Sequence, residues 1–118
     1  MDSTCIIGIQ HAIGWYIEYI TVHWNGRDVG EVLHQHYQSR NHVAELIQGG
    51  SRPFLEGPDD ILDEPGEPSK RVRTHQDFFQ IKEHDPQYYY LFTADNSWVI
   101  YSTHVEPYVQ HENVLYST

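Results

Sequence analysis

The sequence contains one cysteine, few basic residues and no long hydrophobic run. Cys5 alone excludes an intramolecular disulfide and a cysteine-based zinc site, so nothing indicates an oxidising compartment. No apolar run approaches the ~20 residues that a transmembrane helix needs, and the first ten residues lack the basic start of a signal peptide. These absences predict a cytoplasmic protein that is not anchored in a membrane.

The scarcity of basic residues gives the chain a strong negative charge. Seventeen Asp and Glu against seven Lys and Arg give a formal net charge of −10, which repels a phosphate backbone, so we expect no direct binding to nucleic acid. An acidic surface can instead dock on the basic groove of a nucleic-acid-binding protein, although a solvated surface that keeps the protein soluble explains the same charge. The 118 residues fit a single domain, 1–118, with a modest core.

Runs of β-branched and aromatic residues indicate two pairs of strands. CIIGIQ and WYIEYITVHW, at residues 5–10 and 15–24, are separated by a turn and predict an antiparallel hairpin. A second hairpin is predicted at residues 88–92 and 98–101, around a polar loop. Both faces of the strand at 15–24 are partly apolar, which indicates a central strand with a helix or partner chain on one side and a semi-exposed aromatic surface on the other.

Helices are predicted between the two hairpins. Asn25-Gly26 breaks the strand because both residues tolerate positive φ, and Asp28 can cap the helix that follows. Four residues recur with the i, i+3, i+4 and i+7 spacing of one helix face: Val29, Val32, Leu33 and His36. They predict that this helix runs to about Ser39. A second helix, with Asn41 as its cap, ends at Gly49-Gly50. We therefore predict an α+β fold, a small antiparallel sheet of two hairpins with two short helices packed on one face.

The middle and the end of the chain have a different character. Residues 56–69 begin with EGPDDILDEPGE, whose acids, prolines and glycines predict a loop. The basic run at residues 70–73 should neutralise part of this loop through exposed pairs that add little stability. Residues 78–83 predict a short helix, with a strand as the alternative. The weakly patterned residues 104–118 are either an arm that packs on a neighbouring subunit or a frayed tail.

No motif predicts a catalytic, cofactor or metal site. Nine histidines invite a metal hypothesis, but His34 and His36 are two residues apart and lie on opposite sides of a helix, whereas a zinc-binding pair needs i and i+4. The other histidines show no ligand spacing. Cys5 lies in an apolar strand, and the chain has no Gly-x-Ser-x-Gly elbow, P-loop or dinucleotide fingerprint. We expect a protein that is not an enzyme and that holds neither a cofactor nor a metal.

Two ordered groups of residues form a longer pattern. The first begins with His23-Trp24-Asn25-Gly26 and continues through Val29-Gly30, Leu33, His36-Tyr37, Val43, Leu46-Ile47 and Gly49. The second consists of Tyr90-Leu91-Phe92 and Trp98. Together, over about residues 16–50 and 87–100, they resemble a family of small uncharacterised proteins from phages and prophages. Arg27-Asp28 stand where that family usually has Tyr-Pro, and KRVRTHQDFF lacks its central Tyr-x-Arg-Asp-Arg-Gly-like stretch. The resemblance implies a mobile-element origin, a bacterial host cell and a counter-defence context.

These observations leave two functions of different classes. The first is a non-enzymatic inhibitor, of the anti-CRISPR or anti-restriction type, that binds a host defence protein with a basic surface through Glu56, Asp59, Asp60, Asp63, Glu64, Glu67, Tyr88 and Tyr90. The second is a homo-oligomer that sequesters a nucleotide immune signal at the anion-favouring start of a helix, through His23, Trp24, Asn25, Arg27, Arg71 and Arg73. A structural or regulatory phage protein is a third option. The net charge favours the inhibitor. The aromatic Trp24 and His23 at the junction of strand and helix favour the nucleotide-binding protein.

Overall fold

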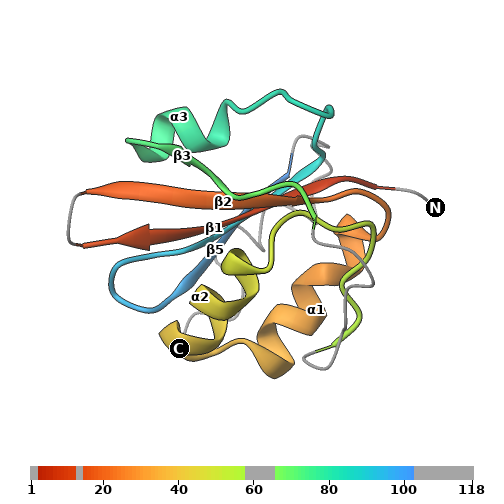
Figure 1. The fold of residues 1–118 in the computed structure, drawn as a ribbon, viewed down its shortest axis with the longest axis horizontal. Helices are drawn as coiled ribbons and strands as arrows, with labels where there is room; N and C mark the ends of the chain where they lie inside the picture. The colour runs from red at the N-terminus through yellow and green to blue at the C-terminus, as the bar shows by residue number, and fades with distance from the viewer. Residues whose placement is uncertain (1–2, 13–14, 58–65, 103–118) are drawn as a thin grey trace.

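A mixed sheet of five strands forms the centre of the structure (Figure 1). The computed structural model describes residues 3–12, 15–57 and 66–102. The strands lie in the order β3-β2-β1-β4-β5, with the bounds β1 Cys5–His11, β2 Tyr16–Val22, β3 Lys70–Val72, β4 Tyr88–Phe92 and β5 Trp98–Ser102. The described residues also form three helices, α1 Gly26–His36, α2 Arg40–Gln48 and α3 His75–Phe79. The predicted α+β class is confirmed, whereas the predicted arm at 104–118 lies outside the described residues.

Both predicted hairpins are present, but the sheet is not wholly antiparallel. β1 pairs antiparallel with β2, and β4 with β5, whereas β1 and β4 run parallel, with Cys5 opposite Tyr88. The long connection from β2 to β4 carries α1, α2, β3 and α3, and it returns the chain to the end of the sheet where β1 starts. The prediction of an antiparallel sheet was wrong at this junction. β3, which the sequence indicated only as a basic run, extends the sheet beyond β2.

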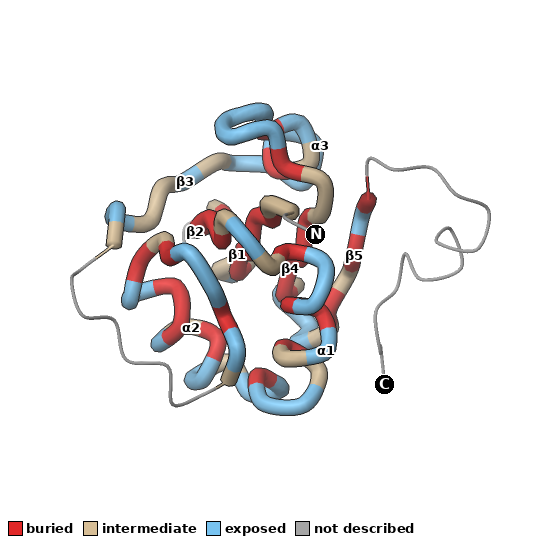
Figure 2. The backbone as a smooth tube through the Cα atoms, turned by 90° about the vertical axis from the view of Figure 1, so that its right-hand side faces the viewer, coloured by how far each residue is buried: buried red, intermediate tan, exposed pale blue. Residues whose placement is uncertain are grey.

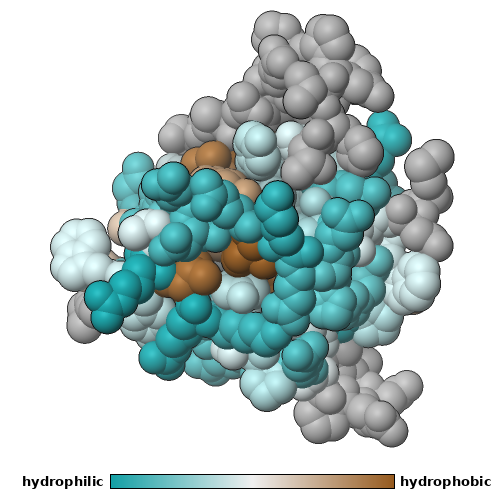
Figure 3. Space-filling model, turned by 90° about the horizontal axis from the view of Figure 1, so that it is seen from above, coloured by the Kyte–Doolittle hydropathy of each residue, from teal (hydrophilic) through white to brown (hydrophobic). Residues whose placement is uncertain are grey.

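Two hydrophobic clusters lie on opposite faces of the sheet. Cys5, Ile7 and Ile9 of β1 belong to the cluster that includes α1 and α2, and Ile6 belongs to the cluster of α3; Figure 1 shows these helices on opposite sides. In Figure 2, β3 and the outer side of α3 are less buried than the central strands. Figure 3, which looks onto the α3 side, shows hydrophobic side chains in a hollow among hydrophilic ones. The buried members of the α3 cluster are nevertheless at most 9% exposed.

That second face also differs from the prediction for β2. We expected a semi-exposed aromatic surface on one side of this strand. Ile17 and Tyr19, which face α3, are instead 1% and 8% exposed. The Tyr19 ring meets Phe78 of α3 edge to face, with the ring centroids 6.4 Å apart. The helix predicted at residues 78–83 lies earlier, as α3 at His75–Phe79, and residues 81–83 follow it outside any helix.

α1 starts earlier than predicted and is not capped by Asp28. The helix begins at Gly26, and Asn25 is its N-cap residue without a side-chain cap hydrogen bond. The Asn25 amide instead holds the backbone of Leu55, donating to its carbonyl at 2.8 Å and accepting from its N–H at 3.1 Å. The side chain that was predicted to break a strand therefore joins α1 to the segment that follows α2.

α2 is capped by Ser39 rather than by Asn41. The Ser39 hydroxyl accepts a hydrogen bond from the N–H of His42 at 3.2 Å, as at many helix starts. The predicted glycine ending is confirmed, because Gly49 follows the helix and Gly50 has a φ of 84°. None of the helices in the described part of the chain has the length and apolar character needed to span a bilayer.

Gly26 is required because the backbone of β1 approaches it closely. Its φ is not positive, so its tolerance of a left-handed conformation is not what the fold uses. A Cβ at this position would lie 2.8 Å from the backbone nitrogen of Cys5 and 2.8 Å from the carbonyl carbon of Thr4. The Tyr90 hydroxyl donates to the Gly26 carbonyl at 2.8 Å, which ties the start of α1 to β4. The helix N-terminus therefore packs directly on the sheet.

We expect Gly26→Ala to destabilise the protein. The added methyl group would overlap backbone atoms that cannot rotate away, so α1 must shift from β1 at a cost of about 1 to 3 kcal/mol. Chemical denaturation of the two proteins measures this difference. Gly57→Ala is the matched control, because a Cβ at Gly57 meets no heavy atom within 4 Å. Equal stability of wild type and Gly26→Ala would contradict the close packing inferred here.

Candidate functional site

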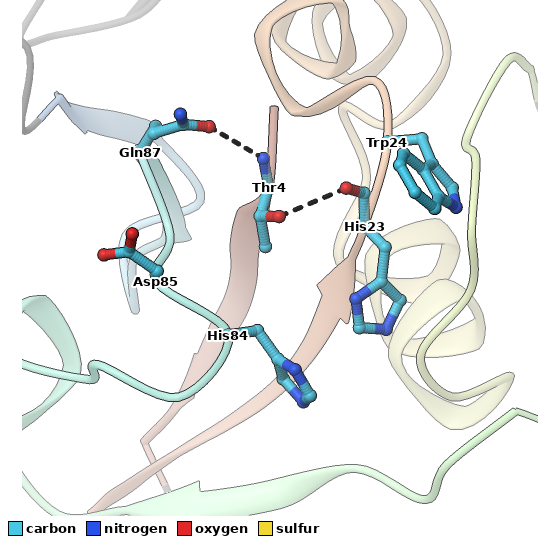
Figure 4. A pocket seen from close by; sticks show the side chains of 6 residues that line it. All are labelled: Thr4, His23, Trp24, His84, Asp85 and Gln87. Atoms are coloured by element: carbon cyan, nitrogen blue, oxygen red, sulfur yellow. Dashed lines mark hydrogen bonds between the residues drawn. The ribbon is translucent and has the colours of Figure 1, made fainter. Parts of the chain in front are cut away.

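An open pocket lies at the end of the sheet where β2 ends and β1 and β4 start (Figure 4). It has a volume of about 420 Å³ and is lined by Thr4, His23, Trp24, His84, Asp85 and Gln87. The first of these precedes β1, the next two follow β2, and the last three come from the connection before β4. The antiparallel pairing of β1 with β2 and its parallel pairing with β4 bring these three segments to the same end of the sheet.

Thr4 holds the three segments of the pocket together. Its hydroxyl donates to the His23 carbonyl at 3.1 Å, and its N–H donates to the side-chain oxygen of Gln87 at 3.0 Å. Its own carbonyl accepts from the Gln87 N–H at 2.9 Å. Thr4 and Gln87 are therefore engaged in positioning the backbone, and the other four side chains can contact a ligand.

The two histidines of the pocket lie edge to face. Their ring centroids are 4.9 Å apart and their planes form an angle of 89°. Burial, followed by the charge of neighbouring His84, lowers the pKa of His23 from its usual 6.5, while Glu67 acts in the opposite direction. The fold therefore favours neutral His23, whose unprotonated ring nitrogen can accept a hydrogen bond or bind a metal ion.

A cluster of charged side chains adjoins the histidines. Lys70 lies between two carboxylates, since its ammonium is 3.4 Å from an oxygen of Glu67 and in closer contact with Oε1 of Glu83. Nε2 of His84 lies 3.4 Å from that same Oε1 of Glu83. One ligand atom from each of Glu67, Glu83 and His84 lies within 4.8 Å of the other two. The hydrogen bond from Lys70 is the largest cause that lowers the pKa of Glu83, so this carboxylate is ionised at neutral pH.

An exposed aromatic ring lines the pocket. Trp24 is 47% exposed. Its backbone N–H donates to the Pro53 carbonyl at 2.9 Å, and Phe54, which follows Pro53 in the chain, is 49% exposed. These are two of the four large hydrophobic side chains exposed among the described residues. Exposed rings that are grouped beside polar groups are typical of a binding surface.

The predicted anion site at the start of α1 is filled by the chain itself. The carbonyl oxygen of Ser3 accepts from the N–H of Gly26 at 2.8 Å, and its hydroxyl accepts from the N–H of Arg27 at 2.8 Å. An anion at a helix N-terminus uses these first N–H groups. The hydrogen bonds to Ser3 therefore satisfy the donors that the nucleotide hypothesis requires.

The residues predicted to bind a nucleotide are only partly brought together. His23 and Trp24 line the pocket, whereas four others do not: Asn25, Arg27, Arg71 and Arg73. The Arg71 guanidinium lies 4.6 Å from the ring centroid of Tyr16, which starts β2 and is therefore at the opposite end of that strand from the pocket. The described residues around the pocket thus do not assemble the predicted arginines for phosphate binding.

The residues predicted to bind a partner also separate in the structure. Tyr90 is 1% exposed and belongs to the core, and Tyr88 is half-buried against the same cluster. Glu56 and Glu67 are exposed. The remaining four acids lie outside the described residues: Asp59, Asp60, Asp63 and Glu64. The exposed aromatic ring that lines the candidate site is therefore that of Trp24 rather than one of the two tyrosines.

Sequence reasoning missed His84 and Asp85. Both have a positive φ, 64° and 52°, in the turn before Pro86, and proline disfavours the helical conformation for the residue that precedes it. His84-Asp85-Pro86 is thus recognisable as a turn. Its position beside His23 depends on the pairing of β1 with β4, for which the sequence has no local signal.

Comparison with known proteins gives no family for this chain. No family model, curated protein or solved structure matches it. The resemblance to phage and prophage proteins therefore stays a prediction. Part of that pattern has a structural role, because Tyr90 donates to Gly26 and the indole of Trp98 donates to the Tyr37 carbonyl at 2.9 Å.

We expect His23 to make the protein less stable in mild acid. The pKa of His23 is lower in the folded chain than in the unfolded chain, where it is 6.5. Neutral His23 therefore contributes its full stability at a pH above 6.5, and this contribution is lost as the pH falls through the pKa of the folded chain. Thermal melts between about pH 7.5 and pH 5, with a chelator present, should therefore show a smaller fall in Tm for His23→Gln than for wild type.

The control for this titration is another histidine of the same domain. His75 is exposed on α3, so His75→Gln should keep the pH dependence of the wild type. An equal fall in Tm for His23→Gln and wild type would show that other groups cause the sensitivity to acid.

Proposed function

We propose that this protein is a non-enzymatic counter-defence protein of a phage or other mobile element, which inhibits a host defence protein by docking on its basic surface. The pocket at the end of β2 carries the proposal, because half-exposed Trp24 and the acidic Asp85 both line it. An arginine or lysine of a partner suits such an opening. Its cation attracts the ring face, and its N–H groups can donate to the carboxylate.

The charges around the pocket support a basic partner over a phosphate. Glu83 contacts His84 of the pocket, and Lys70 is paired with both Glu83 and Glu67. A phosphate would approach several carboxylates here, whereas a basic side chain would be attracted to them. The net charge of −10 adds long-range steering towards a basic surface.

The host context of the proposal comes from the sequence. The resemblance to phage and prophage proteins supports a target in host defence, of the kind blocked by anti-CRISPR or anti-restriction proteins, in the bacterial cytoplasm. The acids from Glu56 to Glu64 begin two residues after Phe54 in the chain. They add negative charge to the segment that carries an exposed ring, which is the combination expected of a surface that binds a basic groove.

Trp24→Ala tests the proposal most sharply. We expect the wild-type protein, purified gently from a lysate of host bacteria, to retain a basic protein at fixed stoichiometry in native mass spectrometry. Trp24→Ala should lose this partner, because truncating an aromatic anchor at the centre of an interface costs about 2 kcal/mol or more. Since carboxylates contribute to the attraction, raised salt should also dissociate the complex.

Trp15→Ala is the matched control for the loss of an exposed indole. Trp15 is 73% exposed but precedes β2, so it lies at the other end of that strand from the pocket. Trp15→Ala should retain the partner. Retention by Trp24→Ala, or equal loss from both variants, would contradict docking at the pocket. A small added mass on a homo-oligomer would instead support the nucleotide-binding alternative.

A further inference from the structure

The charged cluster beside the pocket contains a set of metal ligands from two connections. Glu67 precedes β3, and Glu83 and His84 follow α3. One ligand atom of each lies within 4.8 Å of the other two, and the side chains are 41% to 52% exposed. We propose that Glu67, Glu83 and His84 bind a divalent transition-metal ion of the zinc class, with His23 as a fourth ligand. This inference does not depend on the proposed function.

The ligand types and their spacing suit zinc. Imidazole nitrogens and carboxylate oxygens are ordinary zinc ligands, and a tetrahedral site with bonds of about 2.1 Å separates its ligand atoms by roughly 3.4 Å. The separation of up to 4.8 Å can close by rotation of exposed side chains, without movement of the sheet. Calcium and magnesium prefer sets made only of oxygen, so the imidazole favours a transition metal.

His23 is an independent feature that supports the site. Its ring lies against that of His84 but comes from the end of β2, whose carbonyl is held by Thr4. Its nitrogens lie outside the group of three, so it joins the ion by rotation of its side chain. Two imidazoles and two carboxylates complete a four-ligand set.

The ammonium of Lys70 lies where a metal ion bound by Glu67 and Glu83 would lie. It contacts both Glu67 and Glu83, so a positive charge already balances them. A metal ion must therefore displace the whole side chain, which is 40% exposed and can turn into solvent. Removing Lys70 should strengthen metal binding.

Titration of the untagged protein with Zn²⁺ tests this site. Calorimetry should detect a single Zn²⁺ per chain, and Co²⁺ should give the visible absorption of a tetrahedral complex. His84→Gln should weaken Zn²⁺ binding at least about tenfold, and His23→Gln should weaken it less. Lys70→Met should tighten binding by about tenfold or more, since it removes the competing cation and leaves two carboxylates unbalanced.

His75→Gln is the matched control, because it removes an exposed histidine of α3 that is not in the ligand set. It should bind Zn²⁺ as the wild type does, and circular dichroism should show that every variant is folded. Failure of both wild type and Lys70→Met to bind Zn²⁺ at millimolar concentration would overturn the proposal. Binding that His84→Gln leaves unchanged would overturn it as well, because the ion would then be held by other histidines.

Discussion

The arrangement depends on the burial of β1 on both faces of the sheet. Ile6 lies in the cluster with Phe78, whereas Cys5, Ile7 and Ile9 lie in the cluster with α1 and α2. A strand buried in this way needs a neighbour on each edge for its backbone hydrogen bonds, and β2 and β4 supply them. Burial also raises the pKa of the Cys5 thiol, so this residue is an inert part of the core rather than a nucleophile.

Close packing on β1 also places the segment that completes the site. A Cβ at Gly8 would lie 2.5 Å from a ring carbon of Phe78, so the absence of a side chain allows α3 to rest on the strand. The Tyr89 hydroxyl then donates to the Ile81 carbonyl at 2.5 Å and fixes the chain after α3. From this point the connection runs to His84 and joins β4. The pocket therefore depends on the packing of a helix of only five residues.

Local patterns predicted most elements but not their arrangement in space. The two hairpins and the first two helices follow from alternation and helical spacing, which are signals within one segment. The pairing of β1 with β4 and the addition of β3 join segments far apart in the chain, so neither was predicted. Local signals identified His23 and Trp24 but could not identify His84. The first two lie in a recognisable corner, whereas His84 reaches them only through the sheet.

The phage-protein pattern separates residues that the fold needs from residues that it does not. Gly26 and Tyr90 meet through a hydrogen bond and close packing, which explains both without a ligand. The side chains of His23 and Trp24 both line the open pocket, and the indole of Trp24 is half exposed. Stability alone does not favour an exposed indole next to two imidazoles and several carboxylates. These two residues are therefore the ones to which we assign the proposed binding, and the negative charge around them favours a cationic occupant, whether a basic side chain or a metal ion.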